Sequence, residues 1–195
     1  IDQFFVISGF KRDLVGKKVL VTAGGTREAI DPVRFIGNRS SGKQGIAVAK
    51  AAAARGATVH LIAANVDMAE CDGVVTTHVE SAQQMLSELE KSFSDSDILV
   101  MSAAVADAKP KNSSVQKIDK SDFTSIELQV NPDLLATLSA KKTNQVMVGF
   151  AAQTSELIAS AQSKLISKGL DLIYVNDVTG GAIFGQDETE GTIVL

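Results

Sequence analysis

Short apolar runs alternate with helix-like segments along this chain of 195 residues, and this alternation constrains the fold more than any other feature. Six runs are expected to be strands, at residues 18–23, 57–63, 74–79, 97–103, 145–151 and 170–175, and four segments to be helices, at 42–55, 81–93, 132–141 and 155–168. Such an alternation is typical of a parallel sheet with helices on both faces. We therefore predict an α/β chain with a Rossmann-like three-layer fold and a mostly parallel central sheet.

Local end signals support these helices. Ser81, with Gln84 three residues later, is a capping box, and Asn131 before Pro132 is an expected N-cap with proline at the first helical position. Gly56 and Gly169 are expected to close two helices. A final strand is expected at residues 192–195, after a loop from residue 180.

Composition narrows the class of protein. The length suits one domain, which we place at residues 14–195, possibly shortened at its C-terminus, with residues 1–13 as a linker or the remnant of a preceding domain. A net charge of −4 argues against a nucleic-acid partner. No apolar run approaches a membrane span and no signal peptide opens the chain, so a cytoplasmic location without membrane contact is expected.

The cysteine and histidines give no sign of a metal or a nucleophile. The single cysteine, Cys71, excludes an internal disulfide, and no Cys/His spacing suggests zinc. Both His60 and His78 fall in strand-like runs. We expect these three residues to be structural, and the sequence leaves the ligands of any metal unknown.

A glycine-rich segment, residues 24–45, follows the first expected strand and leads into an alanine-rich helix. A strand that ends in glycines and returns as a helix brings free backbone N–H groups and the positive helix end to one place, where phosphate is favoured. In the helix, Ile46, Ala49 and Ala53 share a face, and small side chains there permit a close approach to the sheet. The segment therefore predicts an anion cradle.

Two common nucleotide motifs fit this segment poorly. The run from Gly37 to Lys43 has the G-x-x-x-x-G-K spacing of a P-loop, but Gln44 stands where that motif needs a magnesium-binding Ser or Thr. A dinucleotide-binding dehydrogenase needs a compact G-x-G-x-x-G, which is absent. The Tyr-Lys pair of short-chain dehydrogenases is missing as well, since Val178 lies four residues after Tyr174, the only tyrosine.

Residues 104–124 form a lysine-rich segment without clear periodicity. Composition alone describes a solvated surface loop. The segment also leaves the carboxyl end of a central strand, which is where open α/β sheets bind ligands. A mobile flap over a phosphate site and a passive loop both stay open.

Six ordered motifs indicate a family. They are Asp31-Pro32-Val33-Arg34-Phe35-Ile36 with Asn38-Arg39-Ser40-Ser41-Gly42-Lys43, then Ala103-Ala104-Val105-Ala106-Asp107, Lys117-Ile118-Asp119-Lys120, Asn131-Pro132-Asp133, Val148-Gly149-Phe150-Ala151-Ala152 and Leu170-Asp171-Leu172-Ile173 leading to Asn176-Asp177. Together they closely resemble phosphopantothenoylcysteine synthetase, the ligase of coenzyme A biosynthesis, over residues 14 to 195. In most bacteria this ligase is the C-terminal half of a bifunctional synthetase/decarboxylase.

The resemblance implies a reaction in two halves. CTP and 4′-phosphopantothenate would give phosphopantothenoyl-cytidylate and pyrophosphate, and L-cysteine would then displace CMP. Mg²⁺ is expected with the triphosphate, and FMN only in a decarboxylase domain that this chain does not contain. A homodimer is also expected, with one subunit's loop completing its neighbour's site, and a fused decarboxylase domain would add higher assembly.

The resemblance also implies site residues. Asn38 and Lys117 would be catalytic. Asn38 would contact the pantothenate carboxyl group or the acyl-cytidylate and help the second half-reaction, and Lys117 would stabilise the charge on departing pyrophosphate. From sequence alone, a loop-capping amide is an equal reading of Asn38. The implied CTP contacts are Gly24, Ser40, Ser41, Gly42, Ala103, Asp107, Lys117, Pro132, Asp133, Leu134, Leu135, Phe150, Lys164 and Lys168.

Two positions depart from the family pattern: Asp119 replaces a flap lysine, and Gln153 replaces an acid. These departures leave unusual kinetics or a lower affinity open, and they do not indicate loss of function. The same ligase using ATP stays open, although the bacterial motif style favours CTP. A non-catalytic nucleotide sensor on the same fold and an NAD(P)-dependent oxidoreductase are the further alternatives.

Overall fold

The computed structural model describes residues 11–66, 71–153, 157–177 and 191–195, and its centre is a seven-stranded sheet. The strand order is β11-β10-β9-β6-β1-β4-β5, and neighbouring strands are parallel except for the antiparallel pair β10 and β11. The strands are β1 (Lys18–Gly24), β4 (Thr58–Ala64), β5 (Val74–Val79), β6 (Ile98–Met101), β9 (Val146–Gln153), β10 (Leu172–Asp177) and β11 (Gly191–Val194). The predicted mostly parallel sheet is confirmed.

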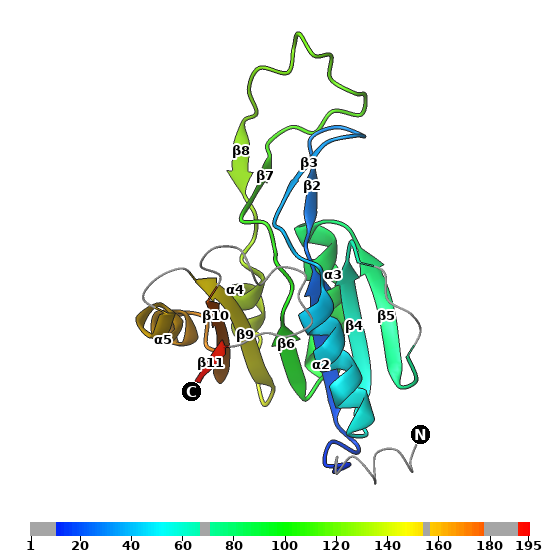
Figure 1. Ribbon diagram of the computed structural model, residues 1–195, viewed down its shortest axis with the longest axis vertical. Helices are drawn as coiled ribbons and strands as arrows, with labels where there is room; N and C mark the ends of the chain where they lie inside the picture. Colours follow the sequence, from blue (N-terminus) through cyan, green and yellow to red (C-terminus); the bar gives the residue numbers. More distant parts are fainter. Residues whose placement is uncertain (1–10, 67–70, 154–156, 178–190) are drawn as a thin grey trace.

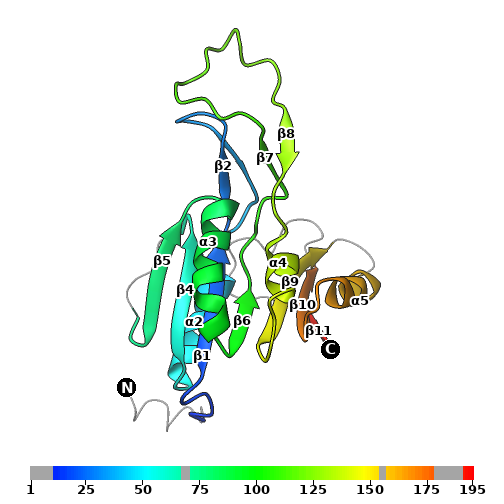
Figure 2. The ribbon, with the colours of Figure 1, turned by 180° about the vertical axis from the view of Figure 1, so that it is seen from behind.

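Helices cover both faces of this sheet, as Figures 1 and 2 show from opposite sides. Helix α2 (Lys43–Ala54) lies on one face, where Val19, Val21 and Ala49 share a buried cluster. Helices α3 (Ala82–Ser92), α4 (Leu134–Ser139) and α5 (Leu157–Ser167) contribute to the core of the other face, around Leu20 and Leu99. Alternate residues of β1 thus enter different cores, because successive strand side chains point to opposite faces. The three-layer prediction is confirmed.

Helix α2 lies very close to β1. Gly45 and Ala49 are buried, and a Cβ added at Gly45 would lie 2.6 Å from the carbonyl oxygen of Thr22. The predicted close approach through small side chains is therefore observed, with Gly45 as the position of tightest contact.

The structure confirms three of the predicted helix ends and corrects one. The capping box between Ser81 and Gln84 is present, and Gly56 and Gly169 have φ angles of 92° and 61° just after α2 and α5. The prediction of Asn131 as an N-cap was wrong. Helix α4 begins at Leu134, and the side chain of Asp133 caps it by accepting from Ala136 N at 3.0 Å.

An arm made of two short antiparallel pairs rises beyond the carboxyl edge of the sheet (Figures 1 and 2). One pair is β2 (Arg27–Ala29) with β3 (Phe35–Gly37), and the other is β7 (Ala108–Pro110) with β8 (Leu128–Val130). We call residues 27–37 and 108–130 the arm. The expectation of an irregular segment at 104–124 is thus corrected in part, because residues 108–110 pair with 128–130. A short 3₁₀ helix, η1 (Phe93–Asp95), follows α3.

Candidate functional site

The candidate site lies where the strand order reverses. From β1 the chain passes through α2 to β4 on one side, whereas from β6 it passes through α4 to β9 on the other, and β1 and β6 are neighbours. The loops after these two strands therefore diverge at the carboxyl edge. Open α/β sheets bind ligands in the crevice at such a switch point.

The N-terminus of α2 forms an anion cradle on one side of this crevice. The N-cap residue, Gly42, provides no capping side chain, and the first turn holds no acidic residue. The positive end of α2 therefore favours an anion at this place. Ser40 and Ser41 are exposed just before the helix, and Ser40 Oγ accepts from Gly42 N at 3.3 Å.

Two glycines of the cradle are required by its backbone geometry. Gly24 ends β1 with a φ of 86°, and Gly42 has a φ of 72°. A Cβ added at Gly42 would lie 2.6 Å from Val66 Cγ1 and 3.2 Å from Gly24 N. Both glycines therefore permit a left-handed conformation and a close approach between β1 and α2 that a side chain would prevent.

The segment after β6 forms the other side of the crevice and is bonded to the segment after β1. Ala104 N donates to Gly24 O at 2.7 Å, and Thr26 N donates to Ala104 O at 3.2 Å. Ala103 N donates to Thr22 Oγ1 at 3.1 Å. Because this N–H group is already bonded, Ala103 can offer a ligand only its carbonyl oxygen and methyl group.

Asn38 joins the two sides of the crevice. Its side chain is exposed, and its Nδ2 donates to Val105 O at 3.0 Å. The backbone carbonyl oxygen of Asn38 lies close to Gly25. A Cβ added at Gly25 would be 2.8 Å from this oxygen. The structure therefore brings Asn38, Gly24 and the 103–105 segment together, as the sequence analysis expected of one site.

A second group of predicted residues surrounds the start of α4. The Asp133 carboxylate caps α4 and forms an ion pair with Lys168, one turn after Lys164 in sequence. Burial raises the pKa of Asp133, but hydrogen bonds from Ala136 N and Lys168 outweigh it and leave that pKa below its ordinary value. Asp107 connects this group to the β6 loop, because its carbonyl oxygen accepts from Asn131 N at 2.9 Å.

The remaining predicted contacts in this region are mainly apolar. Leu134 is buried in the core and Leu135 packs against it, whereas Pro132 is half-buried before α4. Phe150, on β9, contacts Tyr174 in a tilted arrangement, with a centroid distance of 5.3 Å and an angle of 49° between the ring planes. Leu134 thus offers a ligand only its backbone.

Lys117 is the one predicted catalytic residue that the structure separates from the cradle. It lies in the part of the arm between β7 and β8, which both views show at the end remote from the sheet (Figures 1 and 2). Asp119, the first family departure, is exposed in the same segment. The side chain of Gln153, the second, lies outside the described residues.

Sequence reasoning missed two arrangements of polar side chains in the arm. Glu28 is buried at β2, and its Oε1 accepts from Ala82 N at 2.9 Å, which fastens the arm base to the start of α3. Asp31 and Arg34 form a partly buried ion pair in the turn between β2 and β3. The signal for this pair was Asp31 before Pro32, since an aspartate that bonds its own following backbone favours a turn.

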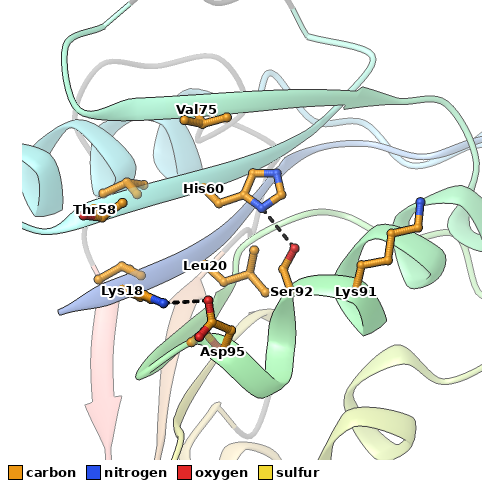
Figure 3. A pocket seen from close by; sticks show the side chains of 11 residues that line it. Lys18, Leu20, Thr58, His60, Val75, Lys91, Ser92 and Asp95 are labelled. Carbon is orange, nitrogen blue, oxygen red and sulfur yellow. Dashed lines mark hydrogen bonds and ion pairs between the residues drawn. The ribbon is translucent and has the colours of Figure 1, made fainter.

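A cavity of about 360 Å³ lies at the opposite edge of the sheet, away from the cradle (Figure 3). His60 lines it, with Nδ1 3.2 Å from Ser92 Oγ and Nε2 2.9 Å from Thr77 Oγ1. Burial lowers the pKa of His60, although the nearby Glu88 charge opposes this. His60 is thus held between two hydroxyl groups and far from the switch point.

The described residues contain neither a cluster of metal ligands nor a membrane-spanning helix. Within those ranges, no group of three or more His, Cys, Asp or Glu side chains is arranged to hold a metal ion. Over the same part of the chain, no helix is long and apolar enough to cross a membrane.

Comparisons with known proteins give a family match and similar proteins for this chain. Residues 14–195 match the family described as DNA/pantothenate metabolism flavoprotein C-terminal domain. The coenzyme A biosynthesis bifunctional protein CoaBC of Mycobacterium bovis is 46% identical over 195 residues, which cover 93% of this chain and 47% of the relative. The chain therefore spans about half the length of that curated relative.

Solved structures share the fold. The C-terminal domain of a CoaBC protein superposes with a TM-score of 0.76 and 41% identity, over 85% of this chain and 79% of that one. A Cab2 mutant in complex with phosphopantothenate-cysteine superposes with a TM-score of 0.72 and 17% identity, over 99% and 82% of the two chains. At that identity the second likeness shows the fold alone.

Proposed function

The chain belongs to the DNA/pantothenate metabolism flavoprotein C-terminal domain family, and on that premise we propose that it is a ligase that joins 4′-phosphopantothenate to L-cysteine. The resemblance to phosphopantothenoylcysteine synthetase inferred from the sequence is confirmed. We assign the activity to residues 14–195 and place the FMN site outside this chain, in a decarboxylase half. The compound in the Cab2 complex is the product that this reaction would give.

The observation that carries the proposal is the meeting of an uncapped helix N-terminus with the loop after β6 at the switch point. The cradle at Gly24, Ser40, Ser41 and Gly42 would bind the triphosphate of CTP through N–H and hydroxyl donors. The group around Lys168 and Asp133 would bind the rest of the nucleotide. Asn38, which bonds to the β6 loop, would lie beside the carboxyl group that reacts.

The reaction proceeds in two displacements. A carboxylate oxygen of 4′-phosphopantothenate attacks the α-phosphorus of CTP, and the bond to pyrophosphate breaks. The cysteine amine then attacks the acyl carbon, loses a proton, and CMP leaves with its electron pair. Neither step needs a nucleophilic side chain, because positioned reactants alone gain effective molarities of about 10⁵–10⁸ M. Donors aimed at the developing charge contribute further.

Magnesium would enter with the triphosphate. Mg²⁺ keeps several waters and is commonly held by one or two carboxylates together with substrate phosphates. The exposed Asp107 carboxylate, at the end of the β6 loop, fits this role. When bound, the ion would neutralise phosphate charge.

We further propose that the protein acts as a homodimer in which the arm of one copy serves the cradle of the other. The part of the arm between β7 and β8, which contains Lys117, extends away from the sheet (Figure 1). It also exposes large apolar side chains that a second copy would cover, namely Val33, Phe35, Val115, Leu128 and Val130. Burial of such side chains drives association.

The test is pyrophosphate release by the purified protein with 4′-phosphopantothenate and Mg²⁺, before and after L-cysteine is added. CTP-dependent release, with CMP formed on addition of cysteine, supports the ligase and both half-reactions. Release with ATP in place of CTP would correct the nucleotide. Binding of CTP without release would favour a nucleotide sensor and withdraw the roles of Asn38 and Lys117.

A further inference from the structure

The Asp31–Arg34 ion pair grips the backbone of the segment that carries Lys117. Ile118 N donates to Asp31 Oδ2 at 3.2 Å, and Arg34 Nη2 donates to Ile118 O at 2.6 Å. The two side chains therefore bond both backbone groups of one residue, as a neighbouring strand would. Arg34 Nε also donates to Asp31 Oδ2 at 2.8 Å, which fixes the pair itself.

Two more contacts hold the same segment, residues 114–123, which we call the strap. The guanidinium carbon of Arg34 lies 3.9 Å from the centroid of the Phe123 ring. At the other end, Ser114 N donates to Ile30 O at 2.9 Å. The strap is thus tied at its start, middle and end to one turn, between β2 and β3.

The turn that makes these contacts is rigid. Asp31 Oδ1 accepts from Val33 N and Arg34 N, both at 2.8 Å, and Ile30 N donates to Arg34 O at 2.8 Å. The Asp31 side chain is fully buried. Burial would raise the pKa of this carboxyl group, but the hydrogen bonds that it accepts from Arg34 and the backbone hold that pKa well below its ordinary value of 3.8.

Lys117 is the residue directly before the clamped Ile118. It is exposed, and within the described ranges its ammonium group has no hydrogen bond or ion pair. A lysine on a fixed backbone has only its own side chain to order when it binds a ligand. A lysine on an untied loop would have to be ordered first.

We propose that Asp31 and Arg34 are positioning residues, which hold the strap so that Lys117 reaches the nucleotide phosphates. The contact of Lys117 with nucleotide phosphates rests on the proposed ligase function. The anchoring of the strap rests on the contacts of the strap alone.

The experiment combines hydrogen exchange with half-reaction kinetics on the full chain. In Asp31→Asn, the amides of residues 114–123 should exchange faster, and pyrophosphate release should fall on the order of ten- to a hundredfold, because small misplacements of a reacting group have effects of that size. Phe123→Ala, which leaves the ion pair in place, should change both quantities in the same direction by less. Asp13→Asn is the matched control, because Asp13 also pairs with an arginine, Arg55 at 2.7 Å, outside the arm.

A double-mutant cycle separates positioning from general structural damage. If Asp31 acts through Lys117, then adding Asp31→Asn to Lys117→Ala should slow pyrophosphate release by less than about twofold further. Unchanged exchange of the strap in Asp31→Asn, or additive effects in the cycle, would overturn the inference. If the wild-type protein releases no pyrophosphate, the ligase function and the phosphate contact of Lys117 are overturned. The hydrogen-exchange result would still decide whether Asp31 and Arg34 anchor the strap.

Discussion

The Asp133 carboxylate and the Lys168 ammonium group form an ion pair that joins the start of α4 to the residue just after α5. This pair connects α4, which precedes β9, to the end of α5, which follows β9, on one side of the crevice. Both side chains are about one-third exposed or more, so the pair contributes little to stability. Its position beside the candidate nucleotide site gives it more importance for binding.

Replacing Lys168 by Met should weaken CTP binding about ten- to a hundredfold with little change in the unfolding midpoint. Loss of one hydrogen bond to a charged group costs about 1.5–3 kcal/mol, and each 1.4 kcal/mol is a factor of ten in affinity. Isothermal titration calorimetry measures the affinity. The control is Lys141→Met, which breaks a similarly exposed pair with Glu90, 2.6 Å long. Equal affinities in the two variants would remove Lys168 from the site.

Replacing Gly42 by Ala should abolish CTP binding and lower the free energy of unfolding by more than about 1–2 kcal/mol. That amount is the cost of a left-handed residue with a Cβ, and here the Cβ also meets Val66. Gly16→Ala is the control, because Gly16 has a φ of 79° and no atom within 4 Å of an added Cβ. Urea unfolding should show a loss of stability from backbone strain in both variants. CTP titration should show a binding defect in Gly42→Ala alone. Intact binding in that variant would contradict the cradle.

Mixing two inactive variants should restore activity if the arm serves a second copy. In a heterodimer of Asn38→Ala and Lys117→Ala chains, one of the two sites then combines an intact cradle with an intact lysine. The mixture, refolded together, should regain a measurable fraction of wild-type CMP formation in the presence of L-cysteine, which needs both half-reactions. No recovery, with heterodimers shown by native mass spectrometry, would mean that each arm serves its own chain.

Stability should fall as the pH drops below about 6.5 because of His60. Burial lowers its pKa in the folded chain from an ordinary value of 6.5, so the unfolded chain binds the proton first. The contribution of neutral His60 is therefore complete above pH 6.5 and is lost as the pH falls toward the lower folded value. Melting temperatures at pH 7.5 and 5.5 should differ less in His60→Gln than in the wild type. His78→Gln, at an exposed histidine, should keep the full difference.

The sheet was predictable from the sequence, but the arm was not. Strands such as β1 and β4 are seven residues long and largely buried, so their apolar runs identify them. The arm strands have three residues each, and β8 is wholly exposed, so no run marks them. Their pairing is set by contacts between distant segments, such as Ser114 with Ile30, which a local pattern does not contain.

The site was also predictable only in part. Residues that follow the ends of β1 and β6 were expected to meet, and Asn38 and Gly24 do lie beside the 103–105 segment. The cap of α4 was misplaced because Asn131 and Asp133 are both good capping residues. Asn131 instead donates to Ala106 O at 2.8 Å, a partner that only the fold brings near. A flap over the phosphate site and a passive loop were both open for the segment that contains Lys117. The structure places that segment on the arm, where the unpredicted Asp31–Arg34 pair bonds Ile118.

Neither of the two buried cores contains a residue of the arm. Substitutions at the exposed apolar positions of the arm therefore leave the packing of those cores unchanged, whereas they alter the surface offered to a second copy. Glu28, at the arm base, is the exception, because its buried carboxylate holds the start of α3. The outer part of the arm is thus free of the constraints that core packing places on the sheet.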